Sequence, residues 1–167
     1  TGHSGGIAVS GDNAYIASGD KIYAILLSSI LSAENGDNVS ISKIIPVNNG
    51  ASFIYADNDY IYVGEYHDGK SITTDHPYET PDGTYYAIVS RYPVENIEKY
   101  HKKNNPILTP DKIYSIRNNA QGICFTPEGK VVLSTSYGID DTVYYVYNED
   151  ATSNSGNILD GAPVYHL

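Results

Sequence analysis

The chain has 167 residues, of which 41% are hydrophobic, so it is long and apolar enough to form one folded domain rather than a disordered chain. Its formal net charge is −10 and its ten basic residues form no stripe, which argues against binding to nucleic acid or anionic lipid. No apolar run approaches the roughly 18–20 residues that a membrane-spanning helix needs. Tyrosine is heavily used, with 17 residues, and favours strands together with the frequent valine, isoleucine and threonine.

One pattern occurs three times along the chain. The residues in the middle of each copy include Gly, Asn or Asp, which tolerate the positive φ that tight hairpins require. Each copy is therefore predicted to form two antiparallel strands, the first at 6–10, 52–56 and 121–126 and the second at 13–18, 59–65 and 130–136. An anchor isoleucine in each copy is followed eight residues later by a second apolar residue, in the pairs Ile7 and Tyr15, Ile54 and Tyr62, and Ile123 and Val131.

Further strands are predicted on either side of these hairpins. A third strand follows each hairpin, at 21–27, 84–92 and 142–147. A fourth strand precedes the next copy, because 43–52 resembles 112–121 when one gap is allowed, and 162–167 is expected to begin another such strand. The segments 28–36 and 93–103 are predicted to be short helical connectors.

Repeated four-stranded meanders of this length are typical of β-propeller blades. The alternative is a β-sandwich of irregular hairpins, against which the equal spacing from anchor to partner argues. We therefore predict an all-β fold, a single partial propeller over 1–167 with blade units at about 1–47, 48–116 and 117–167. The sequence contains no Met and begins within the first copy, so we expect a processed or truncated piece of a longer chain.

Several short motifs also carry a family resemblance. They lie at 3–7 with 13–17, at 62–66, and at 120–123 with 133–138. They resemble motifs of a group of secreted bacterial six-bladed propellers, similar to the NHL and gluconolactonase-type propellers. The resemblance covers nearly the whole chain and implies three blades of a larger ring, outside the cell or at the surface of a bacterium. It implies as partners the missing blades of the same parent protein, or further copies of the chain.

A propeller gathers particular segments at the mouth of its central channel. The residues just before each first strand and just after each second strand meet there, and pockets commonly form at such mouths. The nearby polar residues Ser4, Ser18 and Ser136 belong to the same segments, and each of these side chains could instead be solvated or cap a strand. The predicted ligand-binding residues are His3, Ser52, Glu65, Tyr66, His67, Gln121 and Tyr137.

A metal site is a weaker expectation from the same segments. The resemblance to gluconolactonase-type propellers implies a metal-binding acid at Glu65, and Asn49 or Asn119 is the candidate for a further oxygen ligand to a hard cation such as calcium. The positions that match Glu65 in the other copies are Ser18 and Ser134, which are poor ligands. The insertion 66–86 adds His67, Asp68, Asp75, His76 and Glu79, whose spacing fits no metal motif, so it could equally be a specificity loop or a solvated loop.

Three functions remain open from the sequence. The favoured one is an extracellular module that presents a tyrosine-rich mouth to a glycan or a protein, without assured catalysis. The alternative is a metal-assisted hydrolase of the lactonase or esterase type, in which Glu65 with Asn49 or Asn119 would hold a cation that polarises a carbonyl. The third is a structural fragment of a larger assembly. No catalytic residue is assigned, and Cys124, within a predicted strand, is expected to be a core thiol rather than a nucleophile.

Overall fold

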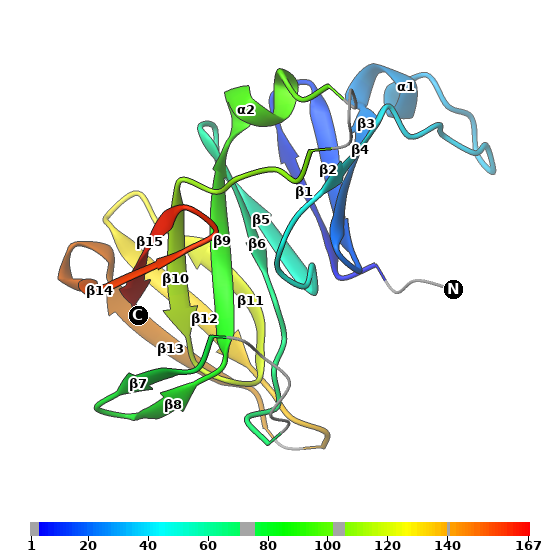
Figure 1. The fold of residues 1–167 in the computed structure, drawn as a ribbon. Helices are drawn as coiled ribbons and strands as arrows, with labels where there is room; N and C mark the ends of the chain where they lie inside the picture. The colour runs from blue at the N-terminus through cyan, green and yellow to red at the C-terminus, as the bar shows by residue number, and fades with distance from the viewer. Residues whose placement is uncertain (1–3, 71–75, 102–105, 140) are drawn as a thin grey trace.

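The computed structural model describes residues 4–70, 76–101, 106–139 and 141–167 (Figure 1). Most of these residues lie in strands, so the prediction of an all-β fold is confirmed. Within the described ranges, no helix is both long and apolar enough to cross a membrane. The strands form sheets of four, six, three and two strands, of which the first three carry the repeats.

The first sheet is an antiparallel meander of four strands, as predicted. Gly11, with a φ of 54°, forms the first hairpin turn, and a short helix, α1 (Leu27–Leu31), follows the third strand. Side chains alternate between the two faces of the sheet, so that Tyr15 and Ile22 are buried against the second sheet. The strands are β1 (Gly6–Ser10), β2 (Asn13–Ser18), β3 (Lys21–Leu26) and β4 (Lys43–Pro46).

The second sheet repeats the meander and is extended by two further strands. Helix α2 (Val94–Glu98) follows its third strand. The strand predicted at 162–167 does form, as β15 (Ala162–His166), but it pairs in parallel with the second sheet rather than joining the third. It lies there because Val164 is fully buried beside Ile113, in a cluster built on the second sheet. The strand order is β14 (Ser153–Leu159), β15, β10 (Lys112–Ile116), β9 (Ala87–Pro93), β6 (Tyr60–Gly64) and β5 (Phe53–Ala56).

The third sheet has three strands among the described residues, so its predicted fourth strand is missing. The strand predicted at 84–92 is also divided. Its beginning forms β8 (Gly83–Tyr85), which pairs with β7 (Tyr78–Thr80) in a separate hairpin, while β9 pairs with β6. The strands of the third sheet are β11 (Ala120–Phe125), β12 (Lys130–Thr135) and β13 (Val143–Asn148), followed by a single turn of 3-10 helix, η1 (Glu149–Ala151).

The third hairpin is one residue longer than the first two. Ile7 pairs with Ile16 and Ile54 with Val63, whereas Ile123 pairs with Leu133, one position further along the chain. The extra residue is accommodated by Gly129, whose φ of 74° lies in the left-handed region. Val132, not Val131, therefore takes the place of Tyr15 and Tyr62, and the equivalence of Val131 with these tyrosines, predicted from equal spacing, is wrong.

The three repeat-bearing sheets stack on one another, with β5 lying against β1 on one side and β11 on the other (Figure 1). In the second and third sheets the anchor isoleucine faces the preceding sheet: Ile54 packs on the first cluster and Ile123 lies within the second. The first cluster is largely aliphatic, and the second is rich in aromatic rings such as Phe53 and Tyr114. The stacking suits propeller blades, and a closed ring remains a prediction.

Cys124 is exposed, so the prediction of a core thiol is wrong. Strand β11 alternates, and Ile123 points toward the second sheet while Cys124 points to the opposite side. No described element covers that side of the third sheet, which leaves the thiol in solvent.

Candidate functional site

One end of the stacked sheets gathers the segments predicted to form the mouth. In each copy, antiparallel pairing brings the start of the first strand to the end of the second, as in the pairs Gly6 with Ala17, Phe53 with Gly64 and Ala120 with Thr135. The predicted residue His3 lies outside the described residues. We call the following set the mouth surface: Ser52, Glu65, Tyr66, His67, Asn119, Gln121 and Tyr137.

The first two copies touch at this end through their backbones. A Cβ on Gly5 would lie 2.0 Å from the Ser52 carbonyl oxygen, so only glycine fits there. The Ser52 N–H donates to the Gly64 carbonyl, which leaves its side chain pointing away from the pairing. Ser52 and Gln121 are both exposed, and neither side chain hydrogen-bonds another described residue. Both polar groups are therefore available to a ligand.

Asn119 joins the second and third copies at the mouth surface. Its N–H donates to the His67 carbonyl at 2.7 Å, and its carbonyl accepts from the Ser136 N–H at 3.0 Å. The Tyr66 hydroxyl donates to Asn119 Oδ1 at 3.3 Å. Asn119 has a φ of 63°, a conformation that asparagine tolerates better than most residues. Three residues predicted from two distant segments, Tyr66, His67 and Asn119, are thus brought together.

The imidazole of His67 is buried and incompletely hydrogen-bonded. It stacks on Tyr86 with ring centroids 5.0 Å apart, and its Nδ1 accepts from the Gly69 N–H at 2.9 Å. An acceptor Nδ1 places the ring proton on Nε2 in the neutral tautomer. That nitrogen is buried and has no hydrogen-bond partner within the described ranges. An unsatisfied buried donor costs about 1–3 kcal/mol, so a partner supplied by a ligand or a water would stabilise this site.

Two tyrosines give the mouth surface its aromatic character. Tyr137 is 40% exposed, and the Lys70 ammonium lies 4.5 Å from the centre of its ring. Tyr66 is partly buried, and this burial, with the nearby Asp68 carboxylate, raises the pKa of its hydroxyl. The hydroxyl of Tyr66 therefore stays protonated and can act as a donor at neutral pH.

Glu65 pairs with His76 rather than with the asparagines expected to share a metal. Glu65 Oε1 lies 2.6 Å from His76 Nε2, and the side chains are only 14% and 15% exposed, respectively. Asn49 is turned inward, where its amide nitrogen donates to the Val63 carbonyl and its Oδ1 accepts from the Tyr92 hydroxyl.

The amide oxygens of both asparagines are thus already hydrogen-bonded within the fold. Across the described part of the chain, no three His, Cys, Asp or Glu side chains are grouped to hold a metal ion. Of the other insertion residues, Asp68 accepts from the Lys70 N–H, Glu79 accepts from the Thr84 hydroxyl, and Asp75 lies outside the described residues.

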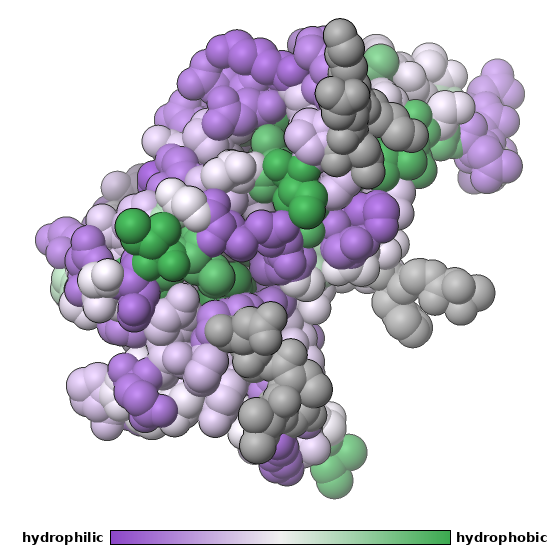
Figure 2. Space-filling model, viewed as in Figure 1, coloured by the Kyte–Doolittle hydropathy of each residue, from purple (hydrophilic) through white to green (hydrophobic). Residues whose placement is uncertain are grey.

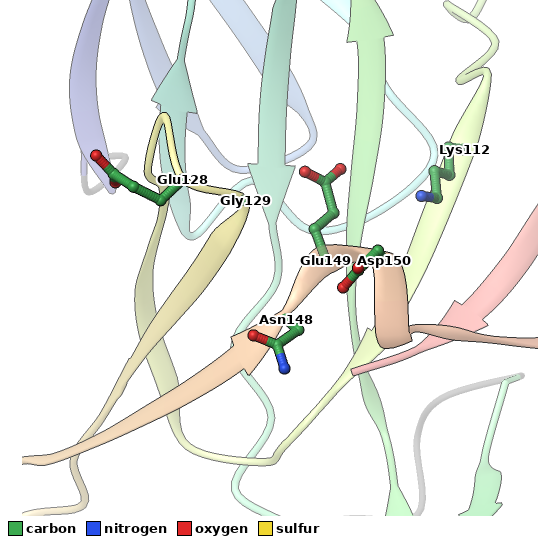
Figure 3. Close-up of a pocket in the computed structure, with 6 residues that line it drawn as sticks. All are labelled: Lys112, Glu128, Gly129, Asn148, Glu149 and Asp150. Atoms are coloured by element: carbon green, nitrogen blue, oxygen red, sulfur yellow. The ribbon is translucent and has the colours of Figure 1, made fainter.

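A polar groove of about 650 Å³ lies at the opposite end of the molecule, between the second and third sheets (Figure 3). The Lys112 ammonium lies over the rings of Tyr114 and Tyr165, and burial is the main cause that lowers the pKa of its amine. Glu149 accepts from the Tyr114 hydroxyl at 3.1 Å, which ties η1 to the second sheet. The groove is lined by Lys112, Glu128, Gly129, Asn148, Glu149 and Asp150.

Sequence reasoning missed this groove, because its residues come from three distant segments with no shared motif. It also missed Asn118, whose side chain accepts from the Tyr86 N–H and donates to the Thr84 carbonyl. The signal for Asn118 was present, since the pair Asn118-Asn119 matches Asn48-Asn49 in the preceding repeat.

Comparison with known protein families finds no family that matches the chain, and comparison with curated proteins finds no match either. The resemblance to NHL and gluconolactonase-type propellers therefore stays a prediction.

Proposed function

We propose that this chain is an extracellular binding module that takes a neutral, hydroxyl-rich ligand, a glycan, on its mouth surface. The observation that carries the proposal is the pair of free polar side chains at the starts of β5 and β11. Ser52 and Gln121 offer an uncharged hydroxyl and amide that no described residue uses, in a chain of net charge −10. Such groups can exchange hydrogen bonds with sugar hydroxyls without requiring a charged ligand.

Two tyrosines at the same end of the stacked sheets support the same ligand class. Tyr66 and Tyr137 combine an apolar ring with a hydroxyl, and tyrosine provides contact area at a low cost in side-chain entropy. A glycan has both apolar C–H faces and hydroxyls, so it suits such a mixed surface. The buried Nε2 of His67 is a further polar atom at this end that no described residue satisfies.

The hydrolase alternative is supported less well. It requires Glu65 and an asparagine to hold one cation, but Glu65 pairs with His76 and the Asn119 oxygen accepts from Tyr66. We therefore assign no catalytic residue. A tightly held calcium ion found by elemental analysis, together with hydrolysis of a lactone or ester, would contradict the binding-only proposal.

A glycan array followed by calorimetry on the best ligand tests the proposal. Tyr137→Ala and Gln121→Ala are each expected to weaken binding at least tenfold, which corresponds to about 1.4 kcal/mol. Asn157→Ala is the matched control, because Asn157 is an exposed amide on β14, away from the mouth surface, and should leave the affinity unchanged. Equal losses in Gln121→Ala and Asn157→Ala, or no glycan bound, would refute the proposal.

A further inference from the structure

The outer face of the first sheet is apolar and uncovered by any described element. Cross-strand partners share a face of a sheet, so the register places Ile7, Ile16, Tyr23 and Ile44 side by side. Ile7 is 67% exposed, Ile44 is 42% exposed, and Val9 on the same face is 55% exposed. We call this set of five residues the leading face. Figure 2 shows hydrophobic side chains at the surface near β3 and β4, against a largely hydrophilic background.

The outer face of the third sheet, at the other end of the stack, carries exposed apolar side chains as well, with Lys130 and Asn148 at one edge. The register of β11, β12 and β13 aligns Cys124 with Val132 and Val146, and Tyr144 lies two residues away on the same face. Tyr144 is 66% exposed and Val146 is 62% exposed. We call these four residues the trailing face. Exposed apolar sheet faces of this kind mark interaction surfaces.

The chain itself shows how two such faces fit together. The face of the second sheet that carries Ile54 packs on the first sheet, and the face of the third sheet that carries Ile123 packs on the second. We call the face that carries the anchor isoleucine the anchor face of each sheet. The same type of contact thus occurs twice, each time between the anchor face of one sheet and the non-anchor face of the sheet before it. The leading face is an anchor face on which no described sheet packs, which is why Ile7 is exposed. The trailing face is the non-anchor face of the third sheet, and within the described ranges no sheet packs on it either.

We propose that a second copy of this chain covers both faces, its trailing face on the leading face of the first copy and its leading face on the trailing face of the first copy. One copy carries both halves of the contact, so two copies satisfy all four faces. Together they would stack six sheets, two sets of the three repeat-bearing ones, within the 4–8 blades that closed propellers use. The contact is heterologous, and it avoids open filaments only if the stack closes on itself.

The area available is enough for such a pair. Four strands spaced about 4.8 Å apart and about five residues long present roughly 320 Å² of flat sheet, and three strands of about six residues present roughly 290 Å². Two contacts therefore bury about 1,200 Å², at the lower end of the range for specific interfaces. The net charge of −10 on each copy opposes association, so added salt should strengthen the pair.

Sedimentation equilibrium at low and at moderate salt tests the proposal directly. The expected mass is twice the 18.2 kDa of one chain, with a tighter pair at higher salt. Ile7→Glu and Val146→Lys should each abolish the pair, because each contact uses one leading and one trailing face. A mixture of the two variants should pair again, since one contact is then native and the other brings Glu and Lys together. Ile158→Glu is the control, because Ile158 is 75% exposed but lies on β14, off both faces.

Thiol labelling gives a second readout that depends on the partner. Cys124 lies on the trailing face, far along the chain from Ile7, and should react slowly in the wild-type pair and rapidly in a folded Ile7→Glu variant. Circular dichroism checks that each variant retains its sheets. The proposal is overturned if the wild-type mass is 18.2 kDa or if a series of larger open species forms. It is also overturned if the Val146→Lys chain still pairs, or if Cys124 is labelled equally in wild type and in Ile7→Glu.

Discussion

Gly5 sits where the backbones of the first two repeat copies come into close contact, and its replacement by alanine tests that approach. The added Cβ would lie 2.0 Å from the Ser52 carbonyl oxygen and 2.3 Å from the Ser52 carbonyl carbon, both of which are backbone atoms. Real Cβ contacts of this kind almost never fall below 3.0 Å, so the start of β1 must move away from β5 by about 1 Å. No flexible side chain can absorb this movement.

The expected cost follows from that displacement. Forcing an extra methyl group into a packed site typically costs about 1–3 kcal/mol, and a backbone clash lies at the upper end of this range. For a protein of this size, a loss of about 3 kcal/mol lowers the midpoint of thermal unfolding by roughly 6–12 °C. This is a large part of the 5–15 kcal/mol by which a typical domain is stable.

Gly122 supplies the matched control for this substitution. It lies in the first strand of the third copy, where an added Cβ would meet no atom within 4 Å and the backbone φ is not in the left-handed region. Gly122→Ala should be neutral or stabilising by up to about 1 kcal/mol, because alanine has less conformational freedom to lose on folding. Urea unfolding followed by circular dichroism measures both variants. Equal stabilities of Gly5→Ala and Gly122→Ala would refute the close approach of β1 and β5.

Two further predictions concern buried charge and hydroxyl groups. Burial raises the pKa of the hydroxyls of Tyr62, Tyr92 and Tyr114 above the ordinary value of 10.0, so these hydroxyls stay protonated in the folded state while they ionise in the unfolded state. The stability that these three hydroxyls contribute should therefore be constant below pH 10 and fall above it, by about 4 kcal/mol per pH unit for three such groups, and the last phenolates should form only together with unfolding; ionisation of all 17 tyrosines without loss of sheet signal would contradict this. Arg91→Lys should cost about 1 kcal/mol in urea unfolding, because lysine cannot reproduce the two 2.9 Å hydrogen bonds to Asp111; an unchanged midpoint would show that the pair contributes nothing.

The sequence predicted the strands of the first two meanders well, because their signals are local. Alternating apolar residues bounded by Gly, Asn and Asp define β1, β2, β5 and β6 to within a residue or two. The same local signals place β11 and β12 correctly. The mouth surface followed from chain direction alone, since antiparallel pairing must bring strand starts and strand ends together.

Other features depend on contacts that no local pattern records. The extra residue in the third hairpin shifts the register by one, which changes the face of each side chain that follows, so Val131 could not be assigned from spacing alone. The parallel pairing of β15 with β10 joins segments that are distant in the chain. The exposure of Cys124 depends on what covers the third sheet, not on the strand in which it lies.

The order in which the sheets stack underlies both the mouth surface and the two outer faces, and methyl NMR measures it most directly. In a sample with labelled isoleucine methyl groups, Ile54 Cγ2 should show a nuclear Overhauser contact to the α-protons of Gly6, since a Cβ placed on Gly6 would lie 3.5 Å from that methyl carbon. Ile123 should show contacts to aromatic protons of the second sheet, and Ile7 should show none to any residue of the second sheet. If the Ile54 methyl contacts the third sheet instead of Gly6, the stacking order is wrong and the account fails.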